Sequence, residues 1–170
     1  MKDGRVKFGK DLKTYHEIPL LYSLGKLNYI VDNKREALKW LNKIINLRTD
    51  SRQDLQAVAG MLVLIIHYEM NNDEIVPYIA RSIQRYMKEK ERMYPLEVYL
   101  LNFFKDIGKE SDKISSMEHL KKLRSDIFEL QRDPSEKNVL GHDFDFIAWV
   151  NSKISGKSYA NCLQDGLIHK

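Results

Sequence analysis

The sequence has little of the residues that cross-link or interrupt a chain. Its 170 residues include 1 Cys, 4 Pro and 8 Gly. A lone Cys162 excludes a disulfide-linked scaffold and fits a reducing compartment. The low Gly and Pro content excludes collagen-like and low-complexity linker proteins. The length suits one domain with enough chain to bury a core.

Long hydrophobic runs are also missing. No apolar run reaches the ~20 residues that span a bilayer, and the most apolar stretch, residues 57–68, is shorter than that. The N-terminus is basic but lacks the apolar segment of a secretory signal. We therefore expect no membrane-spanning segment and a cytoplasmic location.

Positive charge is concentrated in the first part of the chain. The formal net charge is +4; residues 1–50 carry 11 basic and 6 acidic residues, whereas residues 111–170 carry 9 of each. We interpret residues 1–13 as a basic, flexible leader. Nucleic-acid binding usually needs a basic stripe on a folded face. A nucleic-acid partner is therefore not expected, although a nucleic-acid-associated regulator that uses this basic leader is kept as an alternative.

Apolar residues at helical spacing cover most of the remaining sequence, and strand signals are weak. Capping boxes at residues 14–17, 33–36 and 51–54, together with Pro77 and Pro95, predict where helices begin. The predicted helices start between Thr14 and Pro19 and run to residue 31, then cover residues 33–45, 51–70, 71–92, 95–107, 116–132, 144–154 and 159–164.

Two of these helices carry more apolar residues than one face can hold. The helix over 51–70 is apolar nearly all round, which predicts contacts on several sides. The helix over 95–107 has a second apolar face. In the first helix a single stripe is predicted to face the core, formed by Leu20, Leu21, Leu24, Leu27 and Val31.

The first helical pair resembles a tetratricopeptide repeat (TPR). Residues that fall at the family's spacings are Leu21, Leu24, Gly25, Ala37, Leu41 and Ile44. Gly25 would let the two helices approach closely, with Ala37 filling the gap opposite. A shift of 39 residues also aligns the break at residues 32–33 with that at residues 71–72. The sequence departs from the family pattern at Asn28 and near Thr49.

This resemblance implies an all-α protein built as an α-α superhelix. About three helical hairpins would occupy residues 14–132, and a loop and a C-terminal capping helix would occupy residues 133–170. Helical repeats bind peptides on the concave face formed by the first helix of each pair. The residues that would lie on this face are Tyr22, Lys26, Tyr29 and Asn33. Alternatively, the two tyrosines pack against the neighbouring helix.

The aromatic segment over residues 144–149 resembles the C-terminal cap of long, uncharacterised helical-repeat proteins of Bacteroidetes. That resemblance implies that the chain is one end of a larger protein. We expect Phe144, Phe146 and Trp149 to cover the last helical pair. The alternative is an exposed patch that contacts another chain.

The strongest sign of an enzyme is the pair His142 and Asp143. It superficially resembles the metal-binding pair of HD phosphohydrolases, with His119 and Asp165 as further ligands, and such a metal-dependent phosphohydrolase is an alternative function. We prefer the interpretation that Asp143 caps a helix and Asp145 complements its dipole. Cys162 has no visible activating partner. The sequence therefore predicts a non-catalytic protein-protein interaction or scaffolding module without metal or cofactor, whose partner is a protein or peptide.

Overall fold

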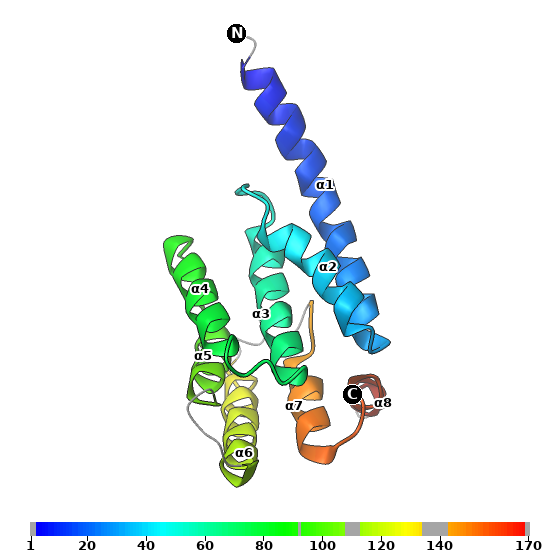
Figure 1. Cartoon of the computed structure of the whole chain (residues 1–170), viewed down its shortest axis with the longest axis vertical. Helices are drawn as coiled ribbons and strands as arrows, with labels where there is room; N and C mark the ends of the chain where they lie inside the picture. Colours follow the sequence, from blue (N-terminus) through cyan, green and yellow to red (C-terminus); the bar gives the residue numbers. More distant parts are fainter. Residues whose placement is uncertain (1–2, 92, 108–112, 134–142, 169–170) are drawn as a thin grey trace. The chain divides into compact units, whose positions relative to one another are not determined.

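The computed structural model describes residues 3–91, 93–107, 113–133 and 143–168, and their side chains except those of residues 3–14, 113–115 and 167–168. These residues form eight α-helices and include no strand (Figure 1), so the predicted all-α class is confirmed. The chain divides into two compact units, residues 1–70 and 71–170, where the length suggested one domain. Each unit is described by itself. No described helix is long and apolar enough to cross a membrane.

The first unit contains three helices that contact one another: α1 (Asp3–Ile30), α2 (Lys34–Ile45) and α3 (Gln53–Glu69). The predicted hairpin of the first two helices is present, since α2 packs against α1. The turn between them places Asp32 in the left-handed region, with φ of 60°. The backbone N–H of Asn33 then donates to the carbonyl of Asn28 at 2.8 Å. This turn reverses the chain within three residues.

Helix α1 begins earlier than the sequence predicted. It starts at Asp3 rather than between Thr14 and Pro19, so the segment interpreted as a flexible leader is helical from Asp3 on. Pro19 lies inside the helix rather than in its first turn. An internal proline removes one backbone hydrogen bond, but the helix is held on both sides of it because Ile18 and Leu21 are buried.

The contact between α1 and α2 depends on Gly25. A Cβ atom at this position would lie 2.7 Å from both Cγ and Cδ2 of Leu41, well inside van der Waals contact. Leu41 and Ala37 are themselves completely buried, so neither side chain has room to move. The prediction that Gly25 allows a close approach opposite Ala37 is confirmed.

Two of the predicted capping boxes do not form. Asn33 precedes α2 as predicted, but its side chain makes no capping hydrogen bond. Helix α3 follows Arg52, which has a left-handed backbone with φ of 50°, and not Ser51. The carboxylate of Asp54 binds the Arg52 guanidinium at 2.8 Å instead of reaching back to cap the chain. Both helices nevertheless begin within two residues of the predicted positions.

Helix α3 is buried on nearly all its faces, as its composition predicted. Its buried residues include Leu55, Ala59, Met61, Leu62, Val63, Leu64, Ile65 and Ile66. One polar side chain, Gln56, is buried among them. Its amide donates to the carbonyls of Thr49 and Ser51, at 3.2 and 2.7 Å. A buried amide needs such partners, and these bonds fix the α2–α3 connection against α3.

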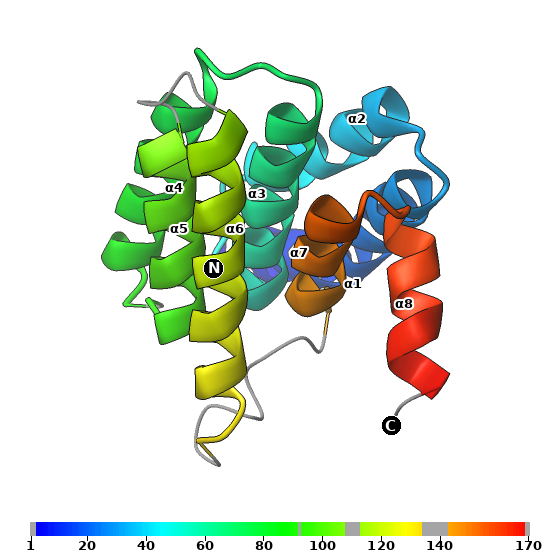
Figure 2. The same cartoon turned by 90° about the horizontal axis from the view of Figure 1, so that it is seen from below.

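The second unit contains α4 (Val76–Glu89), α5 (Pro95–Ile107), α6 (Lys113–Leu130), α7 (Phe146–Ser155) and α8 (Tyr159–Ile168). Each helix packs against the next along the chain (Figure 2). Pro77 and Pro95 lie in first turns, as predicted. The α5–α6 hairpin is also present. The hairpin predicted over residues 51–92 would join α3 and α4, which belong to different units, so that pairing stays a prediction.

Aromatic rings fill the core around α7. Trp149 is completely buried, and its ring lies 6.0 Å from Phe103 and 5.7 Å from Phe104 between ring centroids. Phe144 stacks on Tyr159 at 4.9 Å with an interplanar angle of 8°. Trp149, Phe144 and Phe146 are all buried, so the alternative of an exposed patch is not observed. Trp149 contacts α5, in the predicted last pair, whereas Phe144 stacks on α8.

Helix α7 is capped by Asp145 and not by Asp143, which corrects the predicted start. The Oδ1 atom of Asp145 accepts from the backbone N–H of Ala148 at 2.8 Å. The backbone N–H of Asp145 donates to the hydroxyl of Tyr159 at 3.3 Å, which links the start of α7 to α8. Burial raises the pKa of Tyr159. Gly156, with φ of 72°, ends α7 as predicted.

Candidate functional site

The four residues predicted on a concave binding face do not form an open surface. Tyr22 and Tyr29 are buried, with 5% and 4% of their surface exposed. Lys26 is half-buried, and Asn33 is exposed in the turn after α1. The prediction that these residues line a groove is therefore wrong for the two tyrosines. The alternative, in which they pack inside the protein, is the arrangement observed.

Tyr29 takes part in a polar network that joins the three helices of the first unit. Its hydroxyl donates to Oε1 of Glu69 at 3.0 Å. Lys34 Nζ lies 3.6 Å from Oε2 of Glu69 and also binds Asp32. Burial alone would lower the pKa of Lys34, but its hydrogen bond to Asp32 and the charge of Glu69 raise the pKa above its ordinary value. The network holds the end of α3 against the α1–α2 turn.

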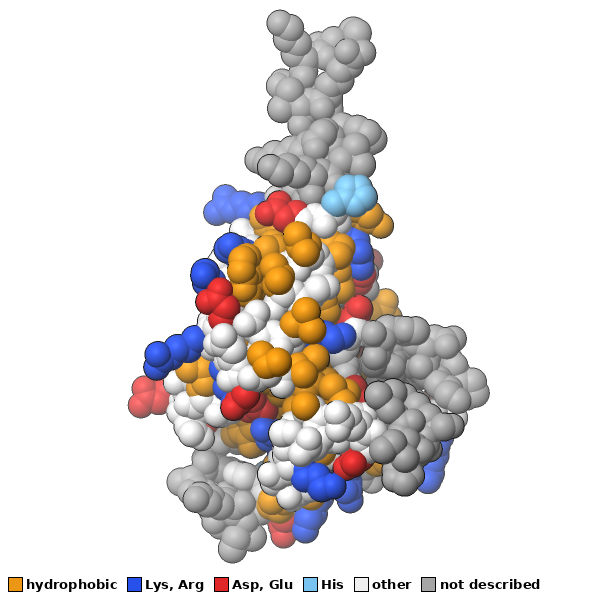
Figure 3. Space-filling view, turned by 90° about the vertical axis from the view of Figure 1, so that its right-hand side faces the viewer, with side chains coloured by type: hydrophobic (Ala, Val, Ile, Leu, Met, Phe, Trp, Pro, Cys, Tyr) orange, Lys and Arg blue, Asp and Glu red, His pale blue; other side chains and the backbone are white. Residues whose placement is uncertain are grey.

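The opposite face of α1 carries an uncovered apolar stripe, which we call the α1 stripe. It consists of Leu20, Leu24, Leu27 and Val31. Leu20, Leu27 and Val31 are 61%, 58% and 72% exposed, and Leu24 is half-buried. Spacings of four, three and four residues place all four within roughly 60° of arc on a helix. Hydrophobic side chains gather on this side of the first unit in Figure 3.

Sequence analysis assigned these residues to the core, and the structure overturns that for Leu20, Leu27 and Val31. The face that packs inward contains Ile18, Leu21, Tyr22, Gly25 and Tyr29. The sequence did contain a signal that these residues lie away from the second helix. Gly25 was expected to touch the second helix, and it lies about 140° around the helix from Leu20. Gly25 and Leu20 therefore could not both face that neighbour.

The second unit contains a partly open groove between α6, α7 and α8, which we call the terminal groove. It encloses about 560 Å³. Helix α6 contributes Arg124 and Phe128, α7 contributes Ile147 and Ile154, and Cys162 lies in the wall formed by α8. The other lining residues are Gln131, Asp145, Ala148, Asn151, Ser155, Lys157, Asp165 and Gly166.

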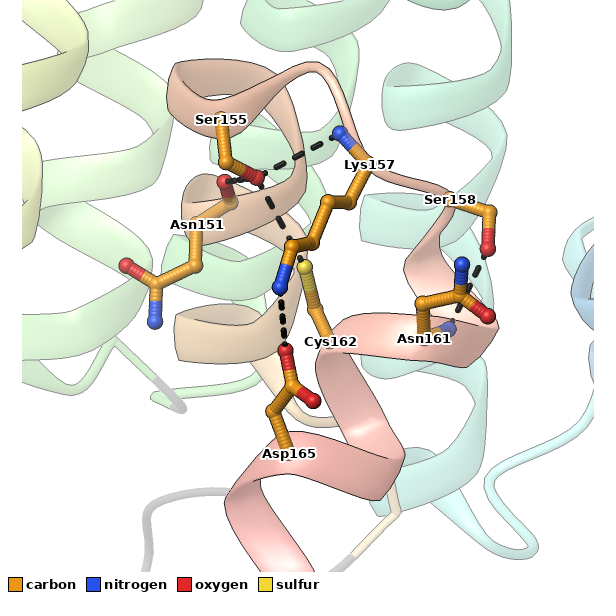
Figure 4. A network of polar contacts seen from close by, with 7 residues as sticks. All are labelled: Asn151, Ser155, Lys157, Ser158, Asn161, Cys162 and Asp165. Atoms are coloured by element: carbon orange, nitrogen blue, oxygen red, sulfur yellow. Dashed lines mark hydrogen bonds and ion pairs between the residues drawn. The ribbon is translucent and has the colours of Figure 1, made fainter.

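One side of the terminal groove is a chain of polar contacts (Figure 4). The Ser155 hydroxyl donates to the carbonyl of Asn151 at 2.7 Å, accepts from the backbone N–H of Lys157 at 3.3 Å, and lies 3.9 Å from Cys162 Sγ. Lys157 Nζ binds Oδ2 of Asp165 at 2.9 Å, which raises the pKa of Lys157. The polar side chains of this wall are thus already bonded to one another or to nearby backbone groups.

The residues proposed for a phosphohydrolase do not assemble where the structure describes them. His142 lies outside the described residues. Asp165 is paired with Lys157, and His119 belongs to α6, where it lines a separate small cavity with Asp106 and Asp126. Among the described residues, no group of three His, Cys, Asp or Glu side chains could hold a metal ion.

Comparisons with known proteins identify no relative. No protein-family model matches the chain, and searches of curated proteins and of solved structures gave no match.

Proposed function

We propose that this chain is a non-catalytic protein-protein interaction or scaffolding module of the cytoplasm, built as a short TPR-like superhelix. The observation that best supports this function is the α1 stripe. Exposed single leucines are common on protein surfaces, but aligned, largely exposed apolar side chains indicate a contact surface. The stripe is flanked by exposed polar residues such as His16 and Ser23, and such residues commonly rim an interface.

The geometry of the α1 stripe suits an amphipathic helix of a partner protein. Leu20 and Val31 are eleven residues apart, which is roughly 16 Å along a helix axis. A partner helix of about three turns would match this length, with apolar residues at i, i+4 and i+7. Covering each exposed side chain would contribute roughly 1–2 kcal/mol.

Site-specific photocrosslinking in the native cell tests this proposal. A photoreactive amino acid placed at Leu27 should give one discrete product with a partner protein. The matched control carries the same amino acid at Lys39 on α2, whose side chain is 59% exposed and pairs with Glu36. Products should be at least tenfold weaker from this position, because it lies off the stripe.

Replacing Leu20 and Val31 together by Asp should abolish the product formed from Leu27. Both side chains are largely exposed, so circular dichroism should show an unchanged helical content. A product of equal yield at Lys39, or one that survives the double substitution, would contradict the proposed role of the stripe.

A further inference from the structure

The size of the terminal groove limits what could occupy it. Its volume of about 560 Å³ lies within the range of sites that hold small ligands or short peptide segments. One turn of helix, about 10 Å wide and about 5.4 Å long, fills roughly 420 Å³. The groove therefore fits a segment of about four residues, whereas the α1 stripe suits a longer helix.

Two cationic and two acidic side chains line the groove, so their formal charges balance, and their partners decide which of them a ligand could pair with. Asp145 caps α7 through Ala148, and Lys157 is paired with Asp165. Arg124 makes no ion pair with any other residue that the structure describes. It is half-exposed on α6. A guanidinium binds a carboxylate through two parallel hydrogen bonds, so a carboxylate on a ligand would complement Arg124.

An apolar surface adjoins this cation. Phe128 lies four residues after Arg124 on α6, so the two side chains share one face of the helix. The Phe128 side chain is 46% exposed although it lines the groove. Ile147 and Ile154 line the groove from α7, and both are half-buried. An apolar side chain placed here would cover surface that is now partly exposed to water.

We propose that the terminal groove binds a short acidic segment of a partner protein. In this segment an Asp or Glu carboxylate pairs with Arg124, and a neighbouring apolar side chain lies against Phe128 and the α7 isoleucines. The groove shares no residue with the α1 stripe, so this is a second docking site, in the second unit, with a partner chemistry of its own.

Peptide titration of the isotope-labelled full chain, followed by NMR, tests the proposal. The probe is an acetylated and amidated tetrapeptide of leucine, glutamate, phenylalanine and leucine, whose only charge is the glutamate. It should shift the amide signals of α6, α7 and α8 that line the groove, and should saturate. The same peptide with glutamine in place of glutamate should bind at least tenfold more weakly, because it cannot pair with Arg124.

Variants at Arg124 test whether its guanidinium binds the glutamate of the peptide. Arg124→Gln should weaken binding at least tenfold, and Arg124→Lys should weaken it less because the charge remains without the planar fork. The matched control is Arg81→Gln on α4. The Arg81 guanidinium lies 4.7 Å from the ring of Tyr78 and does not line the groove, so binding should be unchanged.

Three outcomes would overturn the proposal. The first is equal affinity for the glutamate and glutamine peptides, and the second is unchanged binding by Arg124→Gln. The third is tighter, Arg124-dependent binding of octanoate or of a single-stranded RNA, which would assign the groove to another acid. A chain with Leu20→Asp and Val31→Asp should bind the tetrapeptide normally, so failure here is distinguishable from failure of the α1 stripe.

Discussion

The two units place their tryptophans differently. In the second unit, Trp149 is fully buried against Phe103 and Phe104. In the first unit, Trp40 is only half-buried on α2, and Lys43 Nζ lies 4.1 Å from its ring. The first unit instead brings α1 and α2 together through Gly25, with no Cβ to hold them apart. The second unit thus has a tryptophan at the centre of its core, whereas the α1–α2 contact of the first unit depends on a glycine.

This difference explains which signals in the sequence were informative. A small residue at an interhelical contact specifies a short distance between two helices, and its spacing can be recognised in a sequence. A cluster of rings specifies burial but not which helix each ring meets. The two kinds of packing should also respond differently to substitution.

The largest expected effect is a difference in stability between alanine variants of the two tryptophans. Trp149→Ala should lower the free energy of unfolding by about 3–5 kcal/mol, because it leaves a cavity among Phe103 and Phe104. Trp40→Ala should lower it by about 1 kcal/mol, since it removes a partly exposed ring and its contact with Lys43. Urea unfolding followed by far-ultraviolet circular dichroism measures both. Equal losses would mean that the comparison of the two units is wrong.

Smaller changes in stability are expected from alanine substitutions of two glycines, and the two changes should have opposite signs. Gly25→Ala should destabilise the chain by a net of about 1–2 kcal/mol, because overpacking against Leu41 exceeds the gain in helix propensity. Gly166→Ala lies in α8, where an added Cβ meets no atom within 4 Å. It should stabilise the chain by up to about 1 kcal/mol.

Thermal and urea unfolding of the two glycine variants would measure this difference. If Gly25→Ala were neutral or stabilising, α1 and α2 would not be held at the close distance that the structure shows.

The smallest effect concerns pH. The Arg52 guanidinium holds the pKa of Asp54 below its ordinary value. The pair therefore contributes its full stability above the ordinary aspartate pKa, and loses it as the pH falls through the lowered pKa. Between about pH 6 and about pH 3, the wild-type chain should lose up to about 1 kcal/mol more stability than Asp54→Asn, because the pair is partly exposed.

The second unit supplies a contrast at alkaline pH. Lys157 has a raised pKa because of Asp165, so its contribution is complete below the ordinary lysine pKa and is lost as the pH rises through the raised value. The difference in stability from wild type should thus disappear at acid pH for Asp54→Asn and at alkaline pH for Asp165→Asn. Identical acid profiles for wild type and Asp54→Asn would show that the Arg52 pair does not contribute.

Most of the helical pattern could be predicted because it follows from local rules. Proline is favoured in the first turn of a helix, where Pro77 and Pro95 lie, although Pro19 lies inside α1. Two of the failures at helix starts occurred where a side chain had two possible partners. Asp54 could cap α3 or bind Arg52, and the ion pair formed. Asp143 and Asp145 could each precede α7, and the contact of Tyr159 with the backbone of Asp145 accompanies the later start.

The surfaces that carry the proposals were harder to predict than the helices. Periodicity predicted a single apolar stripe on α1 and placed it in the core, whereas Leu20, Leu27 and Val31 are exposed. The terminal groove could not be predicted either, because Arg124 and Ile147 are far apart in sequence and meet only through the packing of α6 on α7. Prediction therefore succeeded for most helices and for the Gly25 contact, and failed for the start of α1 and for the faces that stay exposed.

The chain's only cysteine lies in the second unit, where its reactivity can be used to measure local opening. Cys162 is 7% exposed and lines the terminal groove, so a thiol reagent should modify it slowly in the closed state and faster when α8 moves away from α7. The rate of modification then measures how often this end of the protein opens, and its dependence on denaturant distinguishes local opening from global unfolding. A ligand in the terminal groove would slow the reaction, without any label having been introduced.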